Sequence, residues 1–259
     1  MTLGGAQEFL GARWVSALVK VAPHRFRRPV AERLLSLSPH YFYGKSYWLS
    51  REELQAEVLR NDESRRKLMD DILTPYLRRD MLVLDYGCGP GFLARHVSQR
   101  VARVYAVDIS EGVLACAKAI NAERSAIEYR NIKTGAPRDA CQFAYSFAVF
   151  QHLTRETAEQ AAEFIYGALG AGGKAVIHVV LDTDDGWKAE SSADSIELKI
   201  KRKYGLNCFS RSEKEYMELF QSCGFADVKI QPVSNFSDVR DDIQTQHILT
   251  ATKPIPKVQ

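Results

Sequence analysis

Glycine recurs at every second position of the short stretch GCGPG, at Gly87, Gly89 and Gly91. An apolar strand precedes this stretch and a helical pattern follows it. Glycine lets the backbone turn sharply and lets a ligand approach closely, because no Cβ stands in the way. In an open parallel α/β sheet, the turn after the first strand lies where ligands bind. The stretch therefore predicts a binding turn, although a tight turn without a ligand would favour the same glycines.

Two aspartates narrow the choice of ligand. Asp85 ends the strand before the turn, where its charge would repel a pyrophosphate, and Pro90 removes a backbone donor that a phosphate would use. The turn thus favours a cationic or zwitterionic group over a dinucleotide. Asp108 ends the next apolar strand, where an acidic residue can bind both hydroxyls of a ribose. A nucleoside with an amino-acid tail and no phosphate, such as S-adenosylmethionine, meets both requirements.

Strands alternate with helices from Met81 onward, and repeated βα units of this kind form a parallel sheet with helices on both faces. The pattern predicts an α/β fold with a doubly wound sheet. The expected strands are 81–85, 104–108, 127–130, 141–149, 174–181 and segments near 228–233 and 245–251. The expected helices are 91–100, 111–122, 155–169 ending at Gly170, and one capped by Ser210 and Glu213.

Residues 1–78 do not show this alternation of strands and helices. Ser50 and Glu53 form a capping-box pattern that opens a long polar helix reaching to about residue 73. We predict that residues 1–78 form a helical lid or substrate cap, and that residues 79–259 form the cofactor-binding domain.

The first helix carries Leu10, Trp14, Leu18 and Val21 at helical spacing, with basic residues beside them. We predict that it serves as a lid or as the contact of a homodimer. The alternative is a helix that lies on a membrane surface.

Charge and cysteine content bear on the class of protein. The mild net charge of +3 neither requires nor excludes a nucleic-acid partner, but the basic runs, at Arg25, Arg27 and Arg28 and at 201–203, are short, so no nucleic-acid partner is expected. Five cysteines without a C-x-x-C pair argue against a disulfide scaffold and against a zinc site. Polar residues interrupt the N-terminal stretch, and no apolar run reaches the roughly 20 residues of a membrane span. We therefore expect a cytoplasmic protein without integral membrane association.

Five segments resemble, in order and spacing, the motifs of the class I S-adenosylmethionine-dependent methyltransferases. They are VLDYGCGPG (83–91), VYAVDIS (104–110), YSFAVFQHL (145–153), GGKAVIHVV (172–180) and the stretch 209–230. The resemblance covers about residues 65–252 and implies a Rossmann-like, mostly parallel seven-stranded sheet with S-adenosylmethionine as cofactor. One departure is Cys141–Gln142, where the family commonly has Phe-Asp. That Asp is usually structural, so the change does not argue against activity.

The resemblance also implies which residues meet the cofactor. The glycines would face its methionine portion, Asp108 would hold the ribose hydroxyls, and Asn131 would contact the adenine amine. The family more often has Asp at this last position, but an Asn oxygen can accept the same hydrogen bond. The complete predicted set is Asp85, Gly87, Cys88, Gly89, Gly91, Asp108, Ile109, Asn131, Ile132, Ser146 and Phe147.

His152 is the candidate for catalysis. It lies just past the fourth strand and titrates in the range of a general base, which a hydroxyl acceptor would need. The alternative is a structural histidine that caps the next helix or packs against the loop. His178, inside the fifth strand, is expected in the core. Asp182, Asp184 and Asp185 could bind Mg²⁺ but fit a solvated loop better, so no metal site is predicted.

Aromatic side chains on two segments are candidates for the acceptor site. Tyr43, Tyr47 and Trp48 would close over the cofactor from the N-terminal side, and Trp187 would form a second wall. The alternative for the first three is to seal the N-terminal region against the sheet. The sequence thus predicts a methyltransferase acting on a small molecule, with a hydroxyl of a natural product, sugar or lipid precursor preferred. The alternatives are an RNA or protein methyltransferase and a non-catalytic cofactor-binding protein, whereas Asp85 and Pro90 oppose a nicotinamide-dependent dehydrogenase.

Overall fold

A computed structural model of the chain describes residues 13–37, 49–183, 209–233 and 246–256. Seven strands within these ranges form one sheet in the order β3-β2-β1-β4-β5-β7-β6. Strand β7 runs antiparallel to both β5 and β6, and the other pairs are parallel. This confirms the expected doubly wound, mostly parallel seven-stranded sheet. The strands are β1 (Leu82–Tyr86), β2 (Arg103–Asp108), β3 (Ile127–Asn131), β4 (Cys141–Ser146), β5 (Leu169–Val179), β6 (Ala226–Val233) and β7 (Gln246–Thr252).

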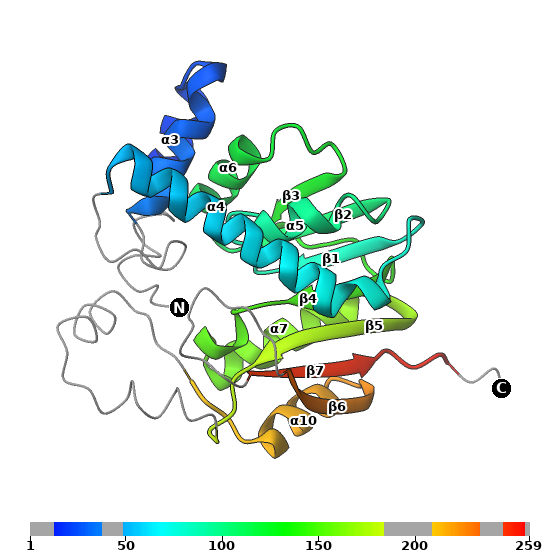
Figure 1. The fold of residues 1–259 in the computed structure, drawn as a ribbon. Coiled ribbons are helices and arrows are strands. Elements are labelled where there is room, and N and C mark those ends of the chain that lie inside the picture. Colours follow the sequence, from blue (N-terminus) through cyan, green and yellow to red (C-terminus); the bar gives the residue numbers. More distant parts are fainter. Residues whose placement is uncertain (1–12, 38–48, 184–208, 234–245, 257–259) are drawn as a thin grey trace.

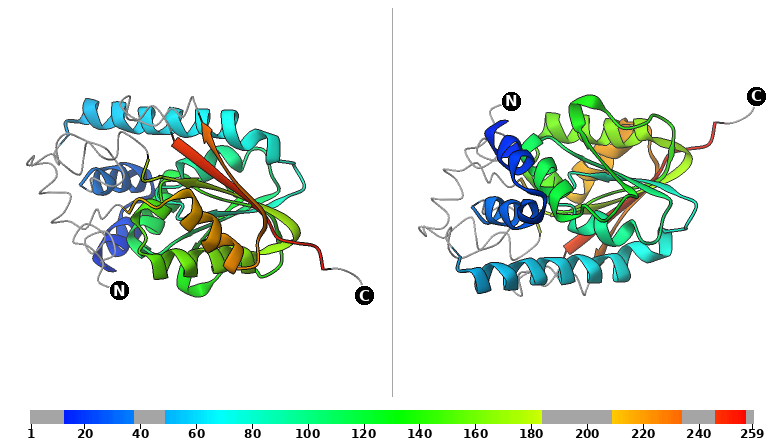
Figure 2. Two further views of the ribbon diagram at one scale, coloured as in Figure 1. Left: turned by 90° about the horizontal axis from the view of Figure 1, so that it is seen from below. Right: turned by 90° about the horizontal axis from the view of Figure 1, so that it is seen from above.

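Helices cover both faces of the sheet, as expected. Figures 1 and 2 show α4 along one face and α7 with α10 along the other. The α-helices are α2 (Arg13–Val21), α3 (His24–Ser36), α4 (Arg51–Leu68), α5 (Phe92–Val97), α6 (Glu111–Ile120), α7 (Arg155–Ala168) and α10 (Glu213–Ser222). Shorter turns are the π-helical η1 (Met69–Leu73) and the 3-10 turns η2 (Thr74–Tyr76), η3 (Ile132–Thr134) and η4 (Phe150–His152). No helix among the described residues combines the length and the apolar character that crossing a membrane requires.

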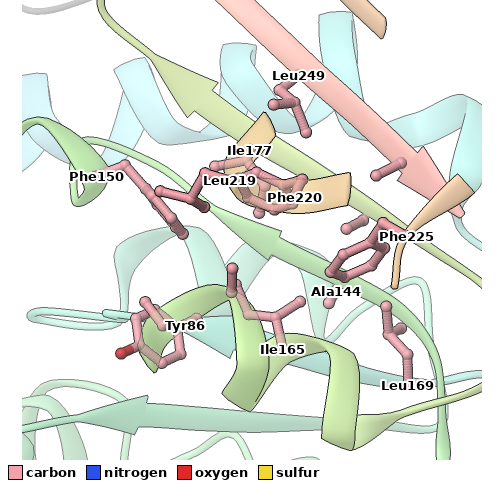
Figure 3. Close-up of a cluster of buried hydrophobic side chains, with 14 of the residues drawn as sticks. Tyr86, Ala144, Phe150, Ile165, Leu169, Ile177, Leu219, Phe220, Phe225 and Leu249 are labelled. Carbon is pink, nitrogen blue, oxygen red and sulfur yellow. The ribbon is translucent and has the colours of Figure 1, made fainter. Parts of the chain in front are cut away.

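The core beneath α7 and α10 is rich in aromatic side chains. Phe150, Phe220 and Phe225 pack there against Ile165 of α7 and Ile177 of β5, as Figure 3 shows. Burying a side chain of this size stabilises the fold by about 1.5–3 kcal/mol, so this cluster holds both helices to the sheet. Because Phe150 opens η4, the same core also fixes the loop after β4.

The opposite face and the N-terminal helices form two further clusters. Leu73 of η1 and Leu93 of α5 pack with the strands of that face. A third cluster joins α2, α3 and α4 to α6. It includes Val15 of α2, Leu35 of α3 and Cys116 of α6. Figure 2 shows α2 and α3 beside the edge of the sheet where the parallel strands end. The division at residue 78 and the lid role stay predictions.

Three expected boundaries were wrong. Helix α7 ends at Ala168, and β5 begins directly at Leu169, which pairs with Cys141 of β4. This pairing draws the following glycines into the strand instead of a turn. Strand β4 ends at Ser146, because Ala148 adopts a left-handed backbone with φ of 57°.

The third error concerns a helix cap. The capping box of α10 is formed by Ser212 and Glu215, not by Ser210 and Glu213, since Arg211 bridges to Leu181 in extended conformation. The capping box that opens α4 is confirmed, with reciprocal bonds between Ser50 and Glu53.

Candidate cofactor and active site

The glycine turn is tied to the end of the neighbouring strand. Gly87, Gly89 and Gly91 have φ values of 75°, 51° and 75°, in the left-handed region that favours glycine. The backbone N–H groups of Gly87 and Cys88 both donate to the Val107 carbonyl, each at 2.9 Å. The Cys88 side chain is buried. The turn therefore has a defined shape at the carboxyl edge of β1 and β2.

Packing also requires glycine at two of these positions. A Cβ at Gly87 would overlap the side chain of Val149, and a Cβ at Gly91 would overlap the hydroxyl of Tyr129. That hydroxyl accepts a hydrogen bond of 2.9 Å from Nδ2 of Asn121, which also donates to the Pro90 carbonyl at 3.1 Å. The buried side chain of Asn121 thus connects the turn to Tyr129 of β3. The sequence pattern did not predict this contact, because Asn121 and Tyr129 lie on separate elements.

Asp85 is a buried acid at the end of β1. The hydroxyl of Tyr145 donates to its Oδ2 at 3.0 Å. The pKa of Asp85 is raised to about 8. Burial is the largest cause and raises it, the Tyr145 hydrogen bond lowers it, and the nearby charge of Asp108 raises it. The side chain is therefore largely protonated at neutral pH. A cation beside it would favour its ionised form.

Asp108 joins the turn to the end of β2. Its Oδ2 accepts from the Gly89 N–H at 3.0 Å, and its Oδ1 accepts from the Ser110 N–H at 2.9 Å. Burial raises the pKa of Asp108, and these backbone hydrogen bonds lower it. A carboxylate oxygen can accept a second hydrogen bond, so both oxygens retain capacity for a pair of hydroxyls.

Asn131 brings the end of β3 to the same edge. Its Nδ2 donates to the Ile109 carbonyl at 3.0 Å, and its Oδ1 accepts from the Lys133 N–H at 2.9 Å. The structure thus places Asn131 beside Ile109, and their predicted contact with adenine stays a prediction. Ile132 is partly buried against the core under α7. The amide oxygen keeps one lone pair for a ligand.

The end of β4 is shaped by its neighbours. The hydroxyl of Ser146 donates to the Tyr86 carbonyl at 2.8 Å, which ties β4 to β1. Phe147 lies nearly parallel to His178, with ring centroids 6.2 Å apart. Nδ1 of His178 accepts from the Ala148 N–H at 3.2 Å, so this buried histidine supports the left-handed turn after β4. In this arrangement, the hydroxyl of Ser146 donates its hydrogen bond within the sheet.

A buried arginine holds the loop that carries His152. Arg211 donates to the carbonyls of Phe150 at 3.3 Å and of Leu153 at 2.6 Å. The Phe209 N–H donates to the Gln151 carbonyl at 2.6 Å, so the segment before α10 runs along η4. His152 is the last residue of η4. Its position is therefore set by a residue about 60 positions away, which the sequence pattern did not single out.

The predicted cofactor residues thus converge on one edge of the sheet, at the ends of β1 to β4. The predicted acceptor residues Tyr43, Tyr47, Trp48 and Trp187 lie outside the described residues, as do Asp184 and Asp185. Within the described ranges, no group of three or more His, Cys, Asp or Glu side chains could hold a metal ion. A surface pocket lined by Tyr76, Phe143 and Lys174 lies at the amino ends of the strands, away from this edge.

The comparisons with known proteins concern this region of the chain. A family profile described as a methyltransferase domain matches residues 83–173, which include the glycine turn and His152. Protein arginine N-methyltransferase 1 of Schizosaccharomyces pombe is 37% identical over 82 residues, 31% of this chain and 23% of that protein. N-demethylindolmycin N-methyltransferase of Streptomyces griseus is 43% identical over 51 residues, 19% of this chain and 21% of that protein. The matches span less than a quarter of either relative.

A solved structure extends the similarity to most of the fold. The magnesium protoporphyrin IX methyltransferase of Synechocystis, with bound SAH, superposes with a TM-score of 0.58. The superposition covers 88% of this chain and 96% of that one, at 16% sequence identity. At this identity the similarity concerns the fold.

Proposed function

We propose that the chain uses S-adenosylmethionine to methylate a small molecule, as the methyltransferase-domain profile matched by residues 83–173 suggests. The observation that carries the proposal is the position of Asp108. Its two oxygens are oriented by N–H groups of the glycine turn and of the loop after β2. This orients a carboxylate at the carboxyl edge, where two ribose hydroxyls can donate to it.

The remaining residues of the edge suit the other parts of the same ligand. Asp85 offers a buried carboxyl group to a cationic amino-acid tail, and the left-handed glycines let that tail approach the backbone. Asn131 and Ile109 offer an amide oxygen and an apolar side chain to adenine. S-adenosylmethionine supplies an electrophilic methyl group on its sulfonium. The task of the chain is then to align an acceptor with that methyl group and to exclude water.

His152 is proposed as the general base for a hydroxyl acceptor. A hydroxyl must lose its proton on methylation, and a neutral imidazole can take it near neutral pH. The clamp by Arg211 on the carbonyls of Phe150 and Leu153 would keep the base in place during this step. We assign the acceptor walls to Tyr43, Tyr47, Trp48 and Trp187, and the preferred acceptors are natural products, sugars and lipid precursors.

Other classes of methyl acceptor, and a protein without catalysis, would give different experimental results. A small-molecule amine is the second candidate, because one relative is named as an N-methyltransferase of demethylindolmycin. An RNA acceptor would require a basic groove beside the site and an affinity that falls steeply with salt. A protein acceptor is a further alternative, which labelling of protein extract would reveal. A non-catalytic protein of this fold would bind the cofactor without transferring a methyl group.

Methyl transfer from radiolabelled S-adenosylmethionine tests the proposal. The panel contains hydroxylated and amino small molecules, total RNA and protein extract, and the enzymes are wild type, His152→Gln and Asp108→Ala. The proposal is supported if a hydroxylated compound is labelled and if His152→Gln slows this labelling by at least about a hundredfold without weakening cofactor binding. Labelling of RNA or protein alone, or cofactor binding with no labelling, contradicts it.

A further inference from the structure

Helices α2 and α3 form a hairpin whose tip stands away from the body of the protein (Figure 1). Every residue from Pro23 to Pro29 is exposed, so the first two turns of α3 have solvent on all sides. Packing begins only further along α3, at Ala31, Leu34 and Leu35. The tip therefore contributes little to the described core, and its side chains need another explanation.

Large apolar side chains are exposed along α2 and at this tip. Trp14, Leu18, Val21 and Phe26 are exposed to 45%, 45%, 76% and 47%. The first three recur at helical spacing along one face of α2, while Val15 and Val19 are buried on the adjacent face. The stripe thus lies outside the core of the hairpin. Neighbouring exposed apolar side chains of this size mark an interaction surface.

The charge of the hairpin has a single sign around this stripe. Lys20, Arg25, Arg27 and Arg28 are exposed, and no carboxylate occurs between Trp14 and Ala31. Along the sequence, the first acid after this stretch is Glu32, which pairs with Arg28 at 2.9 Å. Arg27 donates to the carbonyls of Lys20 and Ala22 at 3.2 and 3.1 Å, which fixes the bend between the helices. The hairpin therefore presents its cations and apolar side chains on a defined scaffold.

The combination of groups identifies the partner. A second copy of the chain would place the same cations against themselves across a two-fold axis, and like charges repel. A nucleic acid would attract the cations but would leave Leu18 and Val21 against phosphates and water. A bilayer with anionic lipids matches both, because its headgroups attract Lys and Arg while its interface accepts Trp, Leu, Val and Phe. We propose that the α2–α3 hairpin docks on anionic membrane surfaces, in contrast to the lid or homodimer role predicted from sequence.

The position of the hairpin gives the docking a consequence. Helices α2 and α3 share a buried cluster with Val113 of α6 and with Phe92, which directly follows the glycine turn. A docked hairpin would therefore hold the cofactor edge near the lipid surface, within reach of amphiphilic acceptors. The docking itself does not rest on the proposed function, because it is measured without methyl transfer.

Cosedimentation with vesicles tests the proposal. The full chain is mixed with vesicles of phosphatidylcholine alone or with about 30% phosphatidylglycerol, at low and high salt. We expect binding to the anionic vesicles that weakens with salt. Because each cation near such a surface contributes about 1 kcal/mol, Lys20→Gln with Arg25→Gln should weaken binding by about thirtyfold. Leu18→Ser with Val21→Ser should weaken binding by about tenfold or more.

Matched controls make the test decisive. Leu59→Ser removes an apolar side chain that is 69% exposed on α4, and Lys214→Gln removes an exposed cation on α10. Both should bind anionic vesicles as wild type does, and circular dichroism should show that all variants fold. The proposal is overturned if the wild type ignores anionic vesicles or if the hairpin variants bind as the controls do. It is also overturned if the protein binds a labelled RNA duplex more tightly than the vesicles and if the hairpin variants weaken that RNA binding.

Discussion

The hydroxyl of Tyr145 lies 3.0 Å from Oδ2 of Asp85, and the two residues are directly paired in the register of β4 and β1. A tyrosine of one central strand thus donates to the buried acid of the next. Since the pKa of Asp85 is raised to about 8, mainly by burial, ionisation of this acid is linked to the stability of the fold.

Between pH 6 and 8, the stability of the free protein should fall as pH rises. The pKa of Asp85 is about 8 in the folded protein and about 3.9 in an unfolded chain. Its contribution to stability is therefore fully present below about pH 4 and is progressively lost as the pH rises to about 8. Asp85→Asn keeps an acceptor for Tyr145 but cannot ionise. Urea unfolding between pH 6 and 8 should show a slope of up to about 1.4 kcal/mol per pH unit that the variant lacks. Asp80→Asn, at an exposed position, should retain it; equal slopes in wild type and Asp85→Asn would refute the assignment.

Binding of S-adenosylmethionine should release a proton. A cationic ligand beside Asp85 lowers the pKa of this acid, so a group that is protonated at pH 7 ionises on binding. Calorimetric titration in two buffers of different ionisation enthalpy should give close to one proton released per ligand at pH 7. Asp85→Asn should release almost none. A wild-type value near zero would mean that the ligand does not approach Asp85.

Gly91 should be intolerant of a side chain. Alanine there would have to adopt φ of 75° and would overlap the Tyr129 hydroxyl, which should destabilise the fold by about 3 kcal/mol. Tyr129→Phe removes that oxygen and should recover part of the loss, whereas the backbone strain remains. The check is the free energy of unfolding of both single variants and the double variant. If the two effects simply add, the steric explanation is wrong.

Arg211 should matter for the loop after β4 and not for the cofactor. Arg211→Ala leaves the carbonyls of Phe150 and Leu153 without these donors and should destabilise the protein by about 2 kcal/mol. Arg155→Ala, whose exposed ion pair with Glu159 is weak, should cost well under 1 kcal/mol. Amide exchange should accelerate at residues 150–153 in the first variant alone. Unchanged protection there would contradict the clamp.

Local patterns were enough to predict the sheet, the glycine turn and the two aspartates. These features rest on short-range rules: apolar strands, left-handed glycines and acids at strand ends. The contacts of Tyr145 and Arg211 were not predictable, because they depend on strand register and on a segment distant in sequence. The cap at Ser212 was misplaced for the same reason, since the alternative at Ser210 fits the local pattern equally well and only the bridge of Arg211 to Leu181 decides between them.

Calorimetric titration with S-adenosylmethionine and its demethylated product, S-adenosylhomocysteine, with NAD as the control ligand, tests whether the carboxyl edge of the sheet binds the proposed cofactor. The proteins are wild type, Asp108→Ala and the matched exposed variant Asp80→Ala. We predict that both nucleosides bind to wild type and Asp80→Ala, that Asp108→Ala weakens both by on the order of a hundredfold, and that NAD does not bind. If the folded wild-type protein binds neither nucleoside, or binds NAD as tightly, S-adenosylmethionine is not its cofactor.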